Sequence, residues 1–249
     1  MTNKRHPYYI LFLHHSTGDV ILHAGKMPSL FERKLLKRQS FVKDWFTNFN
    51  KANNTNYIFD DQYFPKSEPY GWNNYPYDYY NIWIKHAGNQ YYKDEPTLEI
   101  LTQKYNLIIF KHCYPVSDIE EGTNQPDIDS PVKSIENYKL QYEALKQKMK
   151  EFPQTKFLVW TGAARVASST TKEQAERARI FFDWVKTDWN ASDSNIFLFD
   201  FYSMETGDTL YLKEENARSP VNSHPGESFA RRIAPVFCER IIEVIEQNK

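Results

Sequence analysis

The sequence predicts an α/β fold in which a parallel sheet is covered by helices on both faces. Five short apolar runs alternate along the chain with longer amphipathic segments. Near-continuous apolar runs of this length are typical of strands that are buried on both faces. Because strand alternates with helix, we expect a three-layer sandwich with a five-stranded parallel sheet in the middle.

The elements follow in chain order from their residue patterns. The predicted strands are the apolar runs Tyr8 to Leu13, Tyr57 to Phe59, Leu107 to Phe110, Lys156 to Trp160 and Ile196 to Phe199. The predicted helices are the periodic segments of about Leu30 to Asn50, Thr97 to Tyr105, Val132 to Glu151, Lys172 to Trp189 and Ser228 to Gln247. Two irregular segments, residues 60 to 94 and 112 to 131, each follow a strand, and loops of that length are usually functional.

Length and composition indicate a single domain, residues 1–249, and argue against several functions. The 31 basic and 32 acidic residues nearly cancel and no basic run stands out, so we expect no nucleic-acid partner. No apolar stretch reaches the roughly 18 residues that span a bilayer, so we expect no membrane partner and a cytoplasmic location. Cys113 and Cys238 match no zinc or disulfide spacing, which fits a reducing compartment, although a chain trimmed of a leader would look the same.

Polar residues stand where the predicted strands end. In an open parallel sheet, ligands bind outside the carboxyl ends of the strands, so these residues are the candidates for a site. They are Ser16 and Gly18 in "HHSTG", Lys111, His112 and Cys113 in "KHCYP", Thr161 in "TGAAR", and Asp200. Structural alternatives stay open, because Ser16 and Asp200 also suit helix or turn caps, Lys111 and Arg165 suit solvated rim charges, and Cys113 suits a small buried position.

A histidine near the end of the sequence supplies the partner that a serine nucleophile needs. His224 lies in "VNSHPGESFARRIAPVF", just before the last predicted helix, and we expect it in a loop whose turn is fixed by Pro225 and Gly226. In this topology the loop returns to the carboxyl edge of the sheet. A hydroxyl is a weak nucleophile until an adjacent imidazole takes its proton, so Ser16 and His224 together predict nucleophilic catalysis.

The chain resembles the SGNH (GDSL-type) hydrolases in layout and in a few residues. The resemblance rests on Ser16 at the end of the first strand, five strands in a flavodoxin-like α/β arrangement, and a His-Pro before the final helix. It is closest to divergent bacterial members that carry "HHSTG" in place of Gly-Asp-Ser, "YPYDYYNIW", "KHCYP" and "DFY". The resemblance implies that Ser16 is the nucleophile and His224 the base.

Three departures from that family pattern concern the rest of the site. No carboxylate stands in residues 219 to 223, where the family acid usually precedes the histidine, and Asn222 occupies that place. The family asparagine after the third strand is missing, which leaves Lys111, His112 or Cys113 near the oxyanion. Gly71 is the nearest candidate for the family glycine after the second strand. Asp200 is an alternative source of the carboxylate, from a different strand.

The segment 69 to 88, "PYGWNNYPYDYYNIWIKHAG", is rich in aromatic residues. One interpretation is a crevice wall whose rings stack on a sugar, with Asn73, Asn74 and Asp78 as hydrogen-bonding groups. The favoured interpretation is packing on the sheet edge, because Tyr79 and Trp83 have the spacing of a short helix against the core.

We therefore expect a serine esterase or deacylase that acts on an acylated small molecule or glycan. No cofactor and no metal are expected, because the histidines form no His-x-His or His-Glu-x-x-His pattern. Two alternatives remain: a non-catalytic glycan-binding protein of the same fold, and an acyltransferase that uses the same Ser-His pair.

Overall fold

The structure is a computed structural model, and it describes residues 6–26, 40–66, 68–70, 73–190, 195–207 and 209–247. The strands are β1 (Tyr8–His14), β2 (Tyr57–Tyr63), β3 (Leu107–Phe110), β4 (Lys156–Trp160), β5 (Ile196–Phe199), β6 (Ala217–Ser219) and β7 (Asn222–Pro225). The α-helices are α1 (Ser16–Leu22), α3 (Phe41–Asn53), α4 (Pro76–Tyr80), α5 (Leu98–Leu101), α6 (Ile135–Lys150), α7 (Lys172–Trp184), α8 (Phe201–Thr206) and α9 (Glu227–Glu246). Single turns of other helix types are η1 (Asn81–Lys85), η2 (Tyr114–Ser117), η3 (Ala167–Ser169) and η4 (Val185–Trp189).

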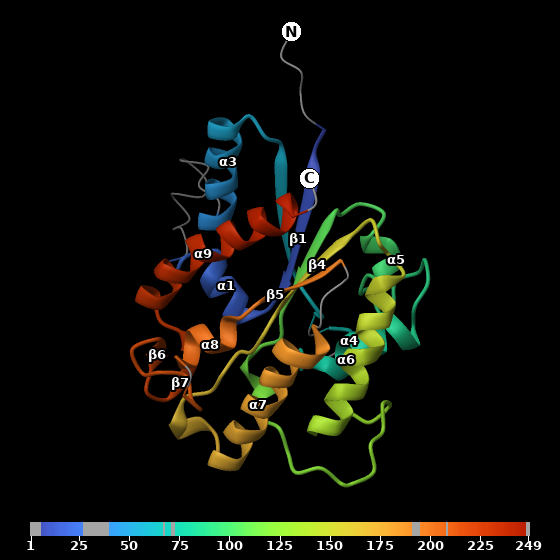
Figure 1. Cartoon of the computed structure of the whole chain (residues 1–249), viewed down its shortest axis with the longest axis vertical. Coiled ribbons are helices and arrows are strands. Elements are labelled where there is room, and N and C mark those ends of the chain that lie inside the picture. Colours follow the sequence, from blue (N-terminus) through green and yellow to red (C-terminus); the bar gives the residue numbers. More distant parts are fainter. Residues whose placement is uncertain are drawn as a thin grey trace.

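The central sheet confirms the predicted α/β class. Its five strands are parallel and lie in the order β2-β1-β3-β4-β5, which is a flavodoxin-like order. Helices α1, α3 and α9 cover one face, and α4, α5, α6 and α7 cover the other (Figure 1). Strands β6 and β7 form a separate antiparallel hairpin before α9.

Side chains of the strands alternate between the two helical layers. In β1, Leu11 and Leu13 pack in the cluster on the α6 side, whereas Ile10 and Phe12 pack in the cluster on the α9 side. The same alternation holds along β3 and β4. Both faces of the sheet are therefore buried, which explains the near-continuous apolar runs of its strands.

Three long helices begin at side-chain caps. The hydroxyl of Ser40 accepts a hydrogen bond from the backbone N–H of Lys43 at the start of α3. At the start of α6, the hydroxyl of Ser134 accepts one from the backbone N–H of Asn137. Thr171 and Gln174 form a capping box at the start of α7. These caps satisfy N–H groups that have no acceptor inside the helix, so they define where each helix begins.

The structure differs from the expected elements in several places. Helix α3 begins at Phe41, whereas the predicted helix began at about Leu30. Residues 27–39, which include the first part of that prediction, lie outside the described residues. Strand β2 continues through the polar residues Asp60, Asp61 and Gln62, because an edge strand pairs on one side only and is partly exposed. The predicted helix 97 to 105 is confined to α5. None of the helices in the described ranges is long and apolar enough to cross a membrane.

Candidate active site

Ser16 is the first residue of helix α1, directly after strand β1. The preceding residue, His15, occupies the N-cap position, so Ser16 is not the N-cap that its sequence context also suggested. The Ser16 hydroxyl instead lies 2.8 Å from Nε2 of His224. The chain places this hydroxyl at the carboxyl end of β1, where α/β folds bind their ligands.

His224 lies on strand β7 rather than in an open loop. The hairpin that carries it is held against the exit of β4, where the Ser223 hydroxyl accepts a hydrogen bond from the backbone N–H of Val166 over 3.2 Å. The backbone N–H of Gly226 donates to the carbonyl of Asn216. A short strand therefore fixes the position of the imidazole more firmly than the expected turn would.

Asn222 contacts the other nitrogen of the His224 ring. Its Oδ1 lies 2.8 Å from Nδ1 of His224 and also accepts the backbone N–H of the same residue over 3.0 Å. An amide oxygen in this position accepts a hydrogen bond from Nδ1–H, and in that tautomer Nε2 carries no proton and can accept the Ser16 proton. Burial lowers the pKa of His224, and the positive charges of Arg218 and Lys111 lower it further.

The segment after β3 divides between the two sides of the sheet. Cys113 brings its Sγ to 4.0 Å from the Ser16 hydroxyl, and Lys111 brings its Nζ to 3.4 Å from that sulfur. His112 points the other way, where its ring meets Tyr79 edge-on with the centroids 4.7 Å apart. Burial, and then the charge of Lys111, lower the pKa of His112 to about 3. Lys111 and Cys113 therefore belong to the surroundings of Ser16, and His112 belongs to the core.

Gly18 allows helix α1 to lie close to the segment after β3. A Cβ atom at Gly18 would lie 2.5 Å from Cβ of His14 and 3.0 Å from Cδ of Lys111. Side chains do not approach that closely, so any other residue would push α1 and Ser16 away from Lys111. Gly71, the other glycine among the predicted site residues, lies outside the described residues.

Asn74, which one interpretation of the aromatic segment placed in a crevice wall, is instead buried beside the site. Its Oδ1 accepts the backbone N–H of Cys113 over 2.5 Å, and its Nδ2 donates to the carbonyl of Phe64 over 2.8 Å. It is fully buried, so it does not line a crevice. The amide takes the N–H that Cys113 would otherwise offer to an oxyanion.

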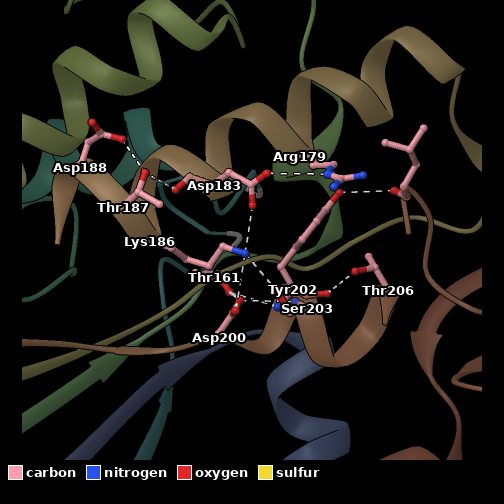
Figure 2. A network of polar contacts seen from close by, with 11 residues as sticks. Thr161, Arg179, Asp183, Lys186, Thr187, Asp188, Asp200, Tyr202, Ser203 and Thr206 are labelled. Carbon is pink, nitrogen blue, oxygen red and sulfur yellow. Dashed lines mark hydrogen bonds and ion pairs between the residues drawn. The ribbon is translucent and has the colours of Figure 1, made fainter. Parts of the chain in front are cut away.

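Thr161 and Asp200 form a different polar network, at the ends of β4 and β5. The Thr161 hydroxyl donates to Oδ1 of Asp200 over 2.7 Å, and the backbone N–H of Ser203 donates to the same oxygen. Lys186 lies between Asp200 and Asp183 (Figure 2). Asp200 thus caps helix α8 and pairs with Lys186, while the Nδ1 atom of His224 faces Asn222.

Tyr114 forms a wall next to the imidazole. Its ring meets that of His224 edge-on with the centroids 5.1 Å apart, and the guanidinium carbon of Arg165 lies over the Tyr114 ring, 4.8 Å from its centroid. Arg165 in turn forms an ion pair with Asp118. Arg165 is therefore not the solvated rim charge that its sequence position suggested.

The aromatic segment packs in the core, as the favoured interpretation predicted. Tyr75, Tyr79 and Trp83 are buried in the cluster on the α6 side, and Trp72 lies outside the described residues. Within the described ranges, no group of three or more His, Cys, Asp and Glu side chains is arranged to hold a metal ion.

Comparisons with known proteins return matches among solved structures. No family model matches the sequence, and no curated protein matches it. A carbohydrate esterase, described as having an active site with divergent catalytic and non-catalytic binding functions, superposes with a TM-score of 0.41 and 12% identity, over 95% of this chain and 65% of its own. A family two carbohydrate esterase from Cellvibrio japonicus gives a TM-score of 0.43 and 12% identity, over 97% of this chain and 62% of its own. The chain spans less than two thirds of the length of these structures.

Proposed function

We propose that the protein is a serine hydrolase that cleaves an ester bond in an acylated small molecule or glycan, with Ser16 as nucleophile and His224 as base. The observation that carries the proposal is the line of contacts from Ser16 Oγ to His224 Nε2 and from His224 Nδ1 to Asn222 Oδ1, each 2.8 Å long. This is the distance at which a histidine takes a proton from a serine hydroxyl.

The reaction follows from these contacts in two steps. His224 takes the Ser16 proton as the oxygen attacks the acyl carbonyl, and then gives that proton to the leaving alcohol as the carbon–oxygen bond breaks. Water, deprotonated by His224 in the same way, then releases the acid and restores Ser16. Asn222 keeps the imidazole in the required tautomer but supplies no negative charge to the imidazolium.

The oxyanion receives limited help from the protein. The backbone N–H of Ser16 stands at the first position of α1 and is available as a donor. The corresponding N–H of Cys113 is already bonded to Asn74. Loss of one oxyanion donor costs on the order of a hundred- to a thousandfold in rate, so we expect slow turnover, best seen with activated esters.

A fluorophosphonate probe tests the proposal without knowledge of the natural substrate. The probe reacts with a serine that a neighbouring base activates, so we expect one covalent adduct, on Ser16, and at least tenfold slower labelling in the folded His224→Ala variant. A protein that takes up no probe at Ser16 would contradict the proposal and favour the non-catalytic glycan-binding alternative.

The pH dependence of turnover should report the environment of His224. The base must be neutral to accept the Ser16 proton, so activity should rise with pH through the pKa of His224 and then level off. Because burial lowers that pKa, the midpoint of the rise should fall below 6.5, the ordinary value for histidine. Rates of p-nitrophenyl acetate hydrolysis between pH 4 and 8, corrected for Ser16→Ala, measure it; a midpoint above 6.5 would contradict this assignment.

A further inference from the structure

A thiol lies 4.0 Å from the Ser16 hydroxyl and an amine lies 3.4 Å from that thiol, and neither takes part in a step of the mechanism above. We propose that Cys113 is a second nucleophile of this site, that Lys111 is its base, and that the thiol accepts acyl groups from activated esters and thioesters. The proposal deepens the proposed function and rests on it only for the access of acyl donors to Ser16.

The fold brings the thiol and the amine together by strand alternation. The chain continues extended beyond β3, so residues two apart point to the same side, and Lys111 and Cys113 both face helix α1. The contact between Lys111 Nζ and Cys113 Sγ measures 3.4 Å. The hydrogen bond from the Cys113 N–H to Asn74 fixes the backbone that carries the thiol.

The surroundings of Lys111 favour a base. The side chain is fully buried, and burial lowers the pKa of its amine, while the nearby Cys113 and Glu205 oppose the shift. Glu205 is also fully buried, and burial raises its pKa to about 8, so this carboxyl is mostly protonated at neutral pH. Burial favours the neutral form of the amine, which is the form that a general base must have before it takes a proton.

The position of the thiol suits attack on the same acyl carbon. Cys113 Sγ lies 4.0 Å from Ser16 Oγ, so an acyl carbonyl placed for attack by Ser16 lies within reach of both atoms. Ser16 with His224 and Cys113 with Lys111 are therefore two pairs of nucleophile and base whose nucleophilic atoms lie 4.0 Å apart.

The transfer balances without any further reactant. Lys111 takes the thiol proton, the sulfur forms a bond to the acyl carbon, and the bond from that carbon to the leaving oxygen or sulfur breaks. The leaving group departs with the electron pair and takes the proton from Lys111 where it needs one. Thioesters lie above alkyl esters in free energy, so the donors must be aryl esters or other thioesters.

Cys238 is the other cysteine of the chain and serves as a control. Both cysteines are buried, with 6% of Cys113 and none of Cys238 exposed. Burial raises the pKa of the Cys238 thiol well above the ordinary value. Only the thiolate attacks readily. A reagent that acylates any cysteine it meets would modify Cys113 at the same rate with and without Lys111.

The test uses the full chain with Ser16→Ala and p-nitrophenyl acetate, read by intact mass and peptide mapping. We expect one acetyl group on Cys113, none on Cys238, and at least tenfold slower acetylation in Ser16→Ala/Lys111→Met. Acetyl on Lys111 also supports the proposal if it disappears in Ser16→Ala/Cys113→Ala, because S-to-N transfer requires the thioester first. His86→Ala, at an exposed residue outside the site, added to Ser16→Ala, should leave the acetylation rate within about twofold.

Two results would overturn the proposal: no Cys113-dependent acetyl group in folded Ser16→Ala, or an unchanged rate in folded Lys111→Met. If Lys111→Met does not fold, the rate of Cys113 in Ser16→Ala is compared with that of glutathione at the same pH. A faster rate than glutathione supports the proposal, and an equal or slower rate overturns it. If wild-type turnover depends on Ser16 but Cys113 is not acetylated in Ser16→Ala, this proposal is refuted and the proposed function stands. If Cys113 is acetylated in Ser16→Ala but wild-type turnover does not depend on Ser16, the proposed function is refuted and this proposal stands.

Discussion

Replacing Ser16 by alanine should reduce the hydrolysis of p-nitrophenyl acetate to the rate of the buffer, because the variant retains no hydroxyl for His224 to activate. Replacing His224 by alanine should lower the rate by about 10² to 10⁴, the usual contribution of a general base. The double variant should be no slower than Ser16→Ala alone, because the two side chains, 2.8 Å apart, act as one unit. Steady-state rates at pH 8 measure all three effects.

Matched controls separate loss of the site from loss of the fold. Ser228 and His86 are exposed, and their alanine variants should keep wild-type rates. Thermal melting should show Ser16→Ala folded, since its side chain is small and only half-buried. Turnover in Ser16→Ala equal to that of the wild type would contradict the assignment of Ser16 as the nucleophile.

Replacing Asn222 by aspartate should raise Ser16-dependent turnover tenfold or more. Asn222 Oδ1 already lies 2.8 Å from His224 Nδ1, so a carboxylate there stabilises the imidazolium that forms as Ser16 attacks. The reverse exchange, acid to amide, costs about ten-thousandfold in a serine triad. The measurement is p-nitrophenyl acetate turnover from pH 6 to 9, with Ser16→Ala in the same background as the blank.

A second charge variant distinguishes this contact from a general electrostatic effect. Val221 is 75% exposed, so Val221→Asp adds the same charge one residue away from Asn222. We expect it to leave the rate within about twofold. Only Asn222→Asp should also shift the acidic limb of the pH profile to higher pH, because the bonded carboxylate favours the protonated imidazole. Unchanged turnover in Asn222→Asp, or a rise that survives Ser16→Ala, would contradict an acid position at residue 222.

The central strands were predictable because their burial on two faces appears directly in the sequence. The runs Leu107–Phe110, Lys156–Trp160 and Ile196–Phe199 coincide with β3, β4 and β5. The end of β2 was not predictable, because its polar residues give no apolar run on an edge strand. Helices α1 and α8 span only two turns or fewer, and so short a segment carries too little periodicity to be recognised.

The candidate site was predictable as far as it depends on strand ends. Because strand ends meet at one edge of the sheet, the sequence predicted Ser16 near Cys113, and the two side chains are in contact. The same reasoning selected Thr161 and Asp200, which contact each other in a separate polar network. The sequence could not show the roles of Asn74 and Tyr114, because their contacts depend on how loops of different strands meet. Strand β7, which carries His224, was not predictable either, because strands as short as β6 and β7 show no recognisable alternation of apolar and polar residues.

The contact between Ser16 and His224 joins residues that are 208 positions apart. Synthesis runs from the amino end, so the ribosome delivers the nucleophile long before the base. A nascent chain carries an ordinary, inert serine until the β6–β7 hairpin has docked near Val166. Any activity that depends on the Ser16–His224 contact therefore requires the docked β6–β7 hairpin, which is synthesised long after Ser16.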